Sequence, residues 1–390
     1  MIAFKLAIKN LIGAGLRTWL NVFILSLSYI IIIWYSGIIE GWNRQARRDT
    51  INWQVGGGQY WQKNYDPYDP FTITESHDVI PEAFRPLIKK DEMTPLLLTQ
   101  GTIYPEGRMQ SVMIKGIDPE QNILKIPSHV LKDGEDFIPA LIGKRMASST
   151  YLKEGDYVTL RWRDVNGTFD AGDAKIVGIF DSTVPMVDNG QIWVQLQKLQ
   201  KMTHMQDQAT LLVASKNFDV NLQVKGWGFK NHDFLFQDLD SIIKSKNIGG
   251  MVLYIILLLL ALLAIFDTQV LSVFRRQREI GTDIALGMTR GQVIRLFTVE
   301  GAMHGVLAAI MGAVYGIPLL YYQAVKGFPL PENTDDFGLA IASKIYPYYS
   351  VGLVISTTII IFISVTIVSY LPTRKITKMN PTEAIRGKIQ

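Results

Sequence analysis

Four long stretches without charge constrain the fold of this chain more than any other feature of its sequence. Residues 18–39, 247–266 and 345–373 contain no Asp, Glu, Lys, Arg or His, and residues 296–325 contain only Glu300 and His304. A helix of about 20 apolar residues crosses the hydrocarbon core of a bilayer. Charged residues make up 19% of the whole chain, against about 25% in soluble domains. The sequence therefore predicts four transmembrane helices and excludes a soluble protein.

The first of these stretches follows basic residues, as the apolar part of a signal peptide does. It is too long for the apolar region of such a peptide, and no small-x-small cleavage site ends it. We therefore interpret it as a retained transmembrane helix.

Basic residues predict the orientation of the helices, because short cytoplasmic loops are rich in Lys and Arg. Residues 267–295, between the second and third apolar stretches, contain five Arg residues, and the tail after the fourth stretch contains five Lys or Arg residues. We expect both segments, together with the N-terminus, on the cytoplasmic side of a bacterial inner membrane. The long stretch between the first two helices is then extracytoplasmic.

The predicted fold class is an α-helical membrane protein with four transmembrane helices and a large α+β extracytoplasmic domain inserted between helices 1 and 2. In this domain, apolar runs separated by Gly, Asn and Asp predict strands at 96–98, 111–114, 157–162, 174–180 and 191–194, and helices at 80–90 and 196–201. The predicted segments are a cytoplasmic N-terminal segment at 1–17, transmembrane helices at 18–41, 247–272, 294–322 and 349–371, the extracytoplasmic domain at 42–246, a cytoplasmic connection at 273–293, an extracytoplasmic loop at 323–348, and a cytoplasmic tail at 372–390.

The sequence contains no recognisable catalytic or metal-binding pattern. The five His residues are scattered without the spacing of metal ligands, and the chain has no Cys, no nucleophile elbow and no Gly-Lys-Ser/Thr phosphate loop. We therefore expect a non-catalytic chain that binds no metal or cofactor itself. No nucleic-acid partner is expected.

The third apolar stretch contains small and ionisable residues. Ionisable residues inside a membrane are functional candidates, so Glu300 and His304 are considered for a proton relay. Glu300 lies only five residues beyond Arg295, and a place at the cytoplasmic interface is the alternative. Two small-xxx-small pairs would let another helix approach closely, although such pairs are common in membrane helices: Gly301 with Gly305, and Gly312 with Gly316.

The cytoplasmic connection contains a short amphipathic helix. Ile280, Ile284 and Leu286 form an apolar stripe among charged residues. Gly287 can end this helix, because glycine readily adopts a positive φ. Such a helix either lies on the bilayer surface or inserts into a groove on a soluble partner.

The same segment resembles the R-x-R-E-I-G-x-x-x-A-L-G motif of the FtsX/MacB/LolC-LolE family of ABC transporter permeases. Residues 7–18, 115–119, 142–158 and 372–386 resemble four further stretches of that family, so the resemblance covers nearly the whole chain. Departures are Asn380 for the usual Asp, Met146 for Leu, and the lack of a fused nucleotide-binding domain. The motif positions are Arg276, Arg278, Glu279, Ile280, Gly281, Ala285, Leu286 and Gly287.

The resemblance implies a permease subunit of the mechanotransmission type. Such permeases pair with a second copy or a paralogue, and a separate ATPase subunit supplies ATP and Mg²⁺ binding. The ATPase contacts the short cytoplasmic helix, so the motif residues and Met288 are the implied coupling residues. Motion driven by ATP then reaches the outer domain, where a periplasmic adaptor or a lipoprotein carrier can associate.

Two classes of function are compatible with this resemblance. The first is transport, as release of a lipoprotein or lipid or as export of an amphiphile; the long outer domain favours it. The second is an FtsX-like switch that regulates an extracytoplasmic enzyme. A membrane sensor outside the ABC class is a third interpretation, and it predicts no ATPase partner.

Overall fold

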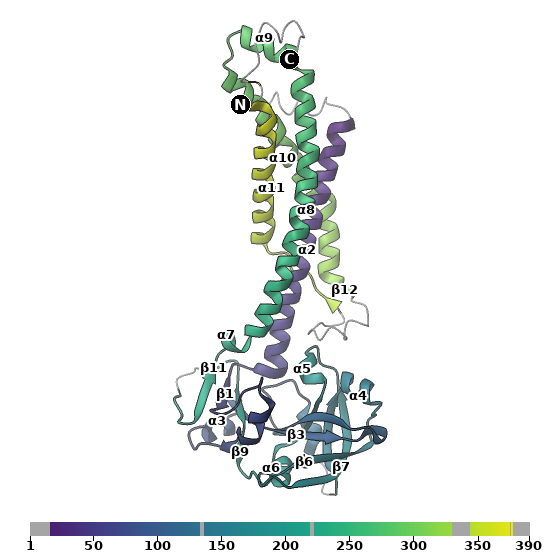
Figure 1. The fold of residues 1–390 in the computed structure, drawn as a ribbon, viewed down its shortest axis with the longest axis vertical. Coiled ribbons are helices and arrows are strands. Elements are labelled where there is room, and N and C mark those ends of the chain that lie inside the picture. Colours follow the sequence, from purple (N-terminus) through teal and green to yellow (C-terminus); the bar gives the residue numbers. More distant parts are fainter. Residues whose placement is uncertain (1–15, 133–135, 219–221, 330–343, 375, 377–390) are drawn as a thin grey trace. The chain divides into compact units, whose positions relative to one another are not determined.

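The computed structural model describes residues 16–132, 136–218, 222–329, 344–374 and 376 (Figure 1). The predictions for the N-terminal segment, for most of the loop at 323–348, and for the tail beyond 376 lie outside these residues. The chain forms two compact units. We call them the helical unit (Met1–Trp42, Ile243–Phe328 and Ile345–Gln390) and the sheet domain (Asn43–Ile242 and Pro329–Lys344).

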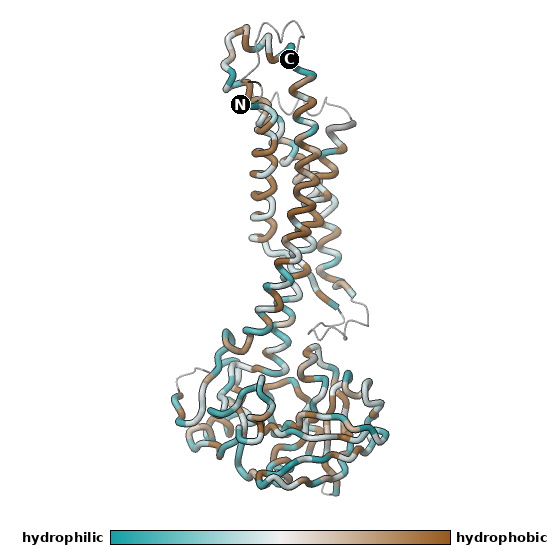
Figure 2. Tube along the Cα trace, in the orientation of Figure 1, coloured by the Kyte–Doolittle hydropathy of each residue, from teal (hydrophilic) through white to brown (hydrophobic). Residues whose placement is uncertain are grey.

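Four helices in the described part of the chain are long and apolar enough to cross a membrane. Figure 2 shows that hydrophobic residues run along the middle of these helices, and most continuously along α8 and α11. Their bounds are α2 (Leu16–Thr50), α8 (Gln237–Arg275), α10 (Arg290–Lys326) and α11 (Val351–Thr373). The short helix α9 (Gln277–Ala285) stands between α8 and α10.

Three of these helices extend well beyond the predicted spans at 18–41, 247–272 and 294–322. The extra turns are polar, as in Asn43–Thr50 of α2. Backbone hydrogen bonds of an α-helix link residues four apart whatever their polarity, so a helix continues after its apolar part ends. The start of α10 has a strong local signal, a capping box between Thr289 and Gln292.

The core of the helical unit is formed by one apolar stripe from each long helix. Val22 and Leu25 of α2, Ile265 of α8, Ala308 of α10 and Ile361 of α11 belong to the same buried cluster. The helices α10 and α11 pack along much of their lengths. Each helix buries only part of its apolar surface within this unit, as expected where lipid or another protein covers the rest.

The sheet domain is built on a nine-stranded sheet with the order β11-β1-β10-β3-β4-β8-β5-β7-β6. Its strands are β1 (Gln59–Gln62), β3 (Met93–Ile103), β4 (Gln110–Ile117), β5 (Ile138–Gly143), β6 (Tyr157–Arg163), β7 (Phe169–Phe180), β8 (Gln191–Gln195), β10 (Leu211–Ala214) and β11 (Trp227–Lys230). Two short ladders pair β2 (Asp78–Val79) with β9 (Gln208–Ala209), and β12 (Phe328–Pro329) with β13 (Lys344–Ile345).

Short helices connect these strands. They are α3 (Arg85–Lys89), α4 (Lys144–Thr150), α5 (Pro185–Asp188), α6 (Leu196–Met202) and α7 (His232–Leu235). Three 3₁₀ turns occur at Pro70–Glu75, Pro105–Gly107 and Ser128–Lys132. A π-helix, Ile51–Val55, follows α2 directly.

An additional pairing closes part of the sheet into a ring. The end of β3 pairs with β6 as well as with β4, through Gly101–Ile103 and Leu160–Trp162. The six strands β3, β4, β8, β5, β7 and β6 therefore enclose a core. Along β6, the buried residues Val158, Leu160 and Trp162 alternate with exposed ones, as a strand with one face on a core requires.

The sequence identified some of these elements and missed others. Strands lie at all five predicted positions, and α6 lies at the predicted helix 196–201. The predicted helix at 80–90 is wrong in its first half, because only Arg85–Lys89 is helical. The short strands β1 and β10 are buried on both faces. Such strands lack the alternation of polar and apolar residues that reveals a strand in a sequence.

Candidate functional site

The helix α9 begins at a sharp break after α8. Arg276, at the break, has non-helical backbone angles (φ −101°, ψ 21°). Its guanidinium donates hydrogen bonds to Glu279 at 2.6 Å and to both carboxylate oxygens of Glu300, at 2.9 and 3.1 Å. It also lies 4.7 Å from the ring centre of Phe297. Arg276 therefore joins the start of α9 to α10.

The apolar side of α9 packs inside the chain itself. Ile280 is fully buried in a cluster with Val273, Val293, Phe297 and Ile376. The family resemblance implies that Ile280 takes part in contact with a partner. In this structure its side chain has no exposed surface, so contact through Ile280 itself stays a prediction. Gln277 and Gly281 are buried on the same side.

The opposite side of α9 is exposed. Its residues recur at intervals of three or four, and so share one face of the helix. Leu286 is the most exposed large apolar side chain near α9, at 81%. We call this set the exposed face of α9: Arg278, Glu279, Thr282, Ala285 and Leu286.

The end of α9 is set by a Schellman motif. Gly287 has φ +105°, as expected for the residue that ends the helix. Its N–H donates to the carbonyl of Ile284 at 3.1 Å, and the N–H of Met288 donates to that of Asp283 at 3.0 Å. The capping box that begins α10 follows immediately. Leu286 therefore lies beside a turn whose backbone is fixed by hydrogen bonds at the end of α9 and at the start of α10.

Glu300 and His304 lie in α10 but have different surroundings. Glu300 is held by Arg276, so it is a paired carboxylate rather than an isolated one, which favours the interfacial interpretation of this residue. His304 is buried, and its Nδ1 lies 3.2 Å from the carbonyl oxygen of Glu300. Among the described residues, the Nε2 of His304 has no hydrogen-bond partner.

The four glycines of the two predicted pairs do not have equal roles. A Cβ atom at Gly301 would overlap the Cβ and Oγ atoms of Ser369 on α11, and one at Gly316 would overlap the end of Ile30 on α2. At Gly305 and Gly312 the nearest atoms would be 3.6 and 3.5 Å away, which is ordinary contact. One glycine of each pair therefore allows close helix packing.

We expect Gly301→Ala to destabilise the helical unit, because buried Ser369 cannot move away from the new methyl group. Overpacking of this kind costs about 1–3 kcal/mol. The matched control is Gly305→Ala, one turn further along the same helix, where a Cβ has room. Membrane abundance and melting temperature in detergent measure both variants. Equal behaviour of the two variants would contradict the close approach at Gly301.

Sequence reasoning missed the structural role of Arg276. The signal was present: an Arg at the end of one apolar stretch and a Glu at the start of the next, joined by a short connection. Opposite charges at adjacent membrane-helix ends are natural partners. In the described residues, no group of three or more His, Asp or Glu side chains is placed to hold a metal ion.

Comparison with known proteins gives the wider context of this site. Residues 251–381 match the family of FtsX-like permease C-terminal domains, a stretch that includes all of α9. The chain is 26% identical over 318 residues to the lipoprotein-releasing system transmembrane protein LolC of Xylella fastidiosa, covering 72% of this chain and 74% of the relative.

Two other relatives match over shorter stretches. The chain is 28% identical over 145 residues to the ABC transporter permease YtrF of Bacillus subtilis, covering 37% of this chain and 33% of the relative. It is 23% identical over 165 residues to the macrolide export ATP-binding/permease protein MacB of Burkholderia cenocepacia, covering 39% of this chain and 21% of the relative. Residues 251–381 match an FtsX-like permease domain, and with its apolar helices the chain is similar to ABC transporter permeases of the FtsX/MacB/LolC family.

Proposed function

We propose that this permease couples ATP hydrolysis in a separate ATPase subunit to conformational work on the outer side of the bacterial inner membrane. The observation that carries the proposal is the geometry of α9. One side of this helix is fixed to α10 by the ion pair of Arg276 with Glu300 and by the packing of Ile280. Leu286 and the charged residues on the other side are exposed. A helix held in this way transmits a force applied to its free side.

The exposed face of α9 suits a protein partner better than lipid. It carries Arg278 and Glu279, which can form complementary charge pairs, beside the apolar Leu286. A partly apolar patch with a charged rim is typical of a protein interface. An ABC ATPase subunit, with ATP and Mg²⁺ bound in that subunit, is the proposed partner. A second permease copy or a paralogue completes the proposed assembly.

Release of a lipoprotein or lipid is the substrate class that we propose, with export of an amphiphile as the broader form of the same activity. The match to LolC extends over 72% of the chain and so includes part of the sheet domain. The matches to YtrF and MacB cover 37% and 39%. A periplasmic carrier or adaptor is then a natural partner of the sheet domain. The alternative is an FtsX-like regulator of an extracytoplasmic enzyme.

Affinity purification of the full chain from native membranes tests this function. We expect one ABC ATPase to co-purify, and we expect ATP hydrolysis by that complex but none by the chain alone. Transport predicts that the complex releases a lipoprotein or lipid from proteoliposomes when ATP is added. Regulation predicts an extracytoplasmic enzyme among the co-purifying proteins instead. Recovery of no ATPase would favour the membrane sensor and contradict the proposal.

The proposed orientation, with both termini cytoplasmic, predicts which positions an impermeant thiol reagent can label in intact cells. The chain has no Cys, so single Cys variants give an unambiguous signal. Exposed Asn189 of the sheet domain is a better probe than its neighbour Asp188, which is fully buried. We expect labelling at position 189 and none at exposed Thr282 of α9. The reverse pattern would invert the topology.

A further inference from the structure

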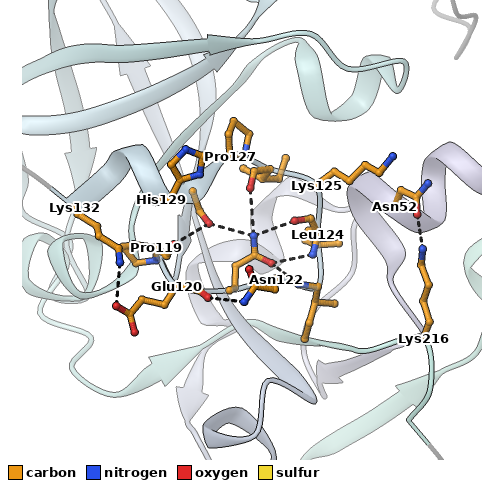
Figure 3. Close-up of a pocket in the computed structure, with 14 residues that line it drawn as sticks. Asn52, Pro119, Glu120, Asn122, Leu124, Lys125, Pro127, His129, Lys132 and Lys216 are labelled. Carbon is orange, nitrogen blue, oxygen red and sulfur yellow. Dashed lines mark hydrogen bonds and ion pairs between the residues drawn. The ribbon is translucent and has the colours of Figure 1, made fainter.

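The sheet domain contains a pocket that the proposed function does not use. Its volume is about 660 Å³, within the range of about 300–1,000 Å³ for sites that hold small ligands. The loop from Pro119 to Lys132 forms most of the lining, and Asn52 and Lys216 complete it (Figure 3).

The lining loop is held in shape by the side chain of Gln121. This buried amide donates from Nε2 to the carbonyls of Leu124 and Ile126, at 3.1 and 3.3 Å, and its Oε1 accepts from the N–H of Leu124 at 2.8 Å. The hydroxyl of Ser128 donates to the carbonyl of Pro119 at 3.3 Å. The pocket is therefore preformed, and several of its carbonyl acceptors are already occupied.

The charged groups of the pocket are mainly ammonium groups. Lys132 pairs with exposed Glu120 at 3.0 Å, and Lys216 donates a hydrogen bond to the side-chain oxygen of Asn52. These two pairs lie at opposite ends of the lining in Figure 3. Lys125 is exposed and has no side-chain partner among the described residues. Three lysines against one glutamate leave two net positive charges, with histidine neutral.

The ammonium groups of these lysines indicate which class of ligand the pocket can bind. Ammonium groups offer only donors, so the pocket suits an oxyanion rather than a metal ion. Lysine acts as a point charge toward phosphate, whereas planar carboxylates are typically bound by the fork of arginine, which is absent from this lining. A phosphate monoester carries about −1.5 to −2 charges at neutral pH, which matches the net charge. Ile123 and Leu124 add apolar surface for an organic group.

The pocket also adjoins an unusual turn of the backbone. Asn52 belongs to the π-helix Ile51–Val55, which directly continues α2, and its carbonyl accepts from the N–H of Lys125 at 2.9 Å. Such π-helices are rare and frequently mark functional sites. We infer that this pocket binds a phosphate monoester, carried by a small soluble molecule or by a lipid headgroup, through Lys125 and Lys216, which both contact Asn52. The inference does not depend on the proposed function.

Calorimetric titration of the full chain in nanodiscs of zwitterionic lipid tests this inference, with glycerol 3-phosphate as the probe. We expect saturable binding that weakens about tenfold for Lys125→Gln and again for Lys216→Gln, as for loss of one charge-assisted hydrogen bond each. We expect a phosphodiester with a single charge to bind more weakly. Lys153→Gln and Lys201→Gln, exposed lysines of the same domain outside the pocket, should bind as the unmodified chain does.

Absence of saturable binding would overturn the inference, and so would an equal loss of affinity in the two control variants. Melting temperatures show whether each variant is folded. If Lys216→Gln unfolds because its bond to Asn52 is lost, the exposed Lys125→Gln decides the question alone. Nanodiscs that contain phosphatidic acid separate the two sources. If phosphatidic acid in the nanodisc weakens the binding of glycerol 3-phosphate, the ligand is a lipid headgroup. If the binding of glycerol 3-phosphate is unchanged, the ligand is a soluble phosphate ester.

Discussion

Leu286→Asp is expected to abolish association with the ATPase while the permease remains folded and abundant in the membrane. Leu286 is 81% exposed, so a carboxylate there costs the isolated chain little. At a protein interface, the change loses about 1.5–3 kcal/mol of apolar burial and leaves a charge without a partner. A total loss of about 3–5 kcal/mol weakens binding by more than about a hundredfold. Co-purification and ATP-dependent activity at equal membrane abundance measure the effect.

Ile280→Asp provides the contrasting variant, six residues earlier in the same segment. Its side chain is fully buried in a cluster with residues of α8 and α10 and with Ile376, so a carboxylate there disrupts the chain itself. We expect low membrane abundance and a lower melting temperature, whether or not the ATPase is present. If Leu286→Asp keeps its partner and full activity, the exposed face of α9 is not the coupling surface. If Ile280→Asp folds normally but loses the partner, the buried position of Ile280 is contradicted.

Arg145→Met is expected to cause the largest loss of stability in the sheet domain. Arg145 at the start of α4 donates to Asp188 Oδ2 at 2.7 Å and to the carbonyl of Ser182 at 2.9 Å. Asp188, at the end of α5, is fully buried. Removing one partner of a buried ion pair costs about 3–5 kcal/mol, because the other charge stays buried without compensation. Thermal melting of the full chain should show a decrease of about 10 °C.

The neighbouring residue provides the control. Lys144 pairs with Asp181 at 3.1 Å, but both side chains are largely exposed, so Lys144→Met should change stability by less than about 1 kcal/mol. The double variant Arg145→Met with Asp188→Asn should recover part of the loss, since the buried charge is gone. Equal melting temperatures for Arg145→Met and Lys144→Met would show that the buried pair does not stabilise the domain.

The same pair predicts how the effect depends on pH. Burial raises the pKa of Asp188, and the adjacent Arg145 opposes this rise. A carboxyl whose pKa is higher in the folded state stabilises that state when it is protonated, and this contribution is lost as pH rises through the folded-state pKa. In Arg145→Met the opposing charge is absent, so the pKa of Asp188 rises further. The deficit of this variant should therefore shrink as the pH falls through the raised pKa of Asp188.

The membrane character of the chain could be predicted from the sequence with little ambiguity. Long charge-free stretches have few alternatives to membrane helices, because a bilayer supplies no hydrogen bonds to an irregular backbone. The end of α9 was also predictable, since Gly287 tolerates the positive φ that a helix end requires. Alternating residues located β6, whereas the doubly buried β1 and β10 have no such pattern and were missed.

The sequence by itself determined which segments are apolar and which residues of the α9 region match a family motif. Only the tertiary structure decided what each of those residues does. Ile280 and Leu286 are both apolar residues in or beside one short helix, yet contacts with α10 and Ile376 bury the first completely and leave the second exposed. Likewise, Gly301 and Gly305 are equivalent in the sequence, but Ser369 on α11 and Gln269 on α8 leave no room for a Cβ atom at Gly301, whereas Gly305 has that room. Contacts between residues far apart in the chain depend on how whole helices and strands pack, and no local pattern records them.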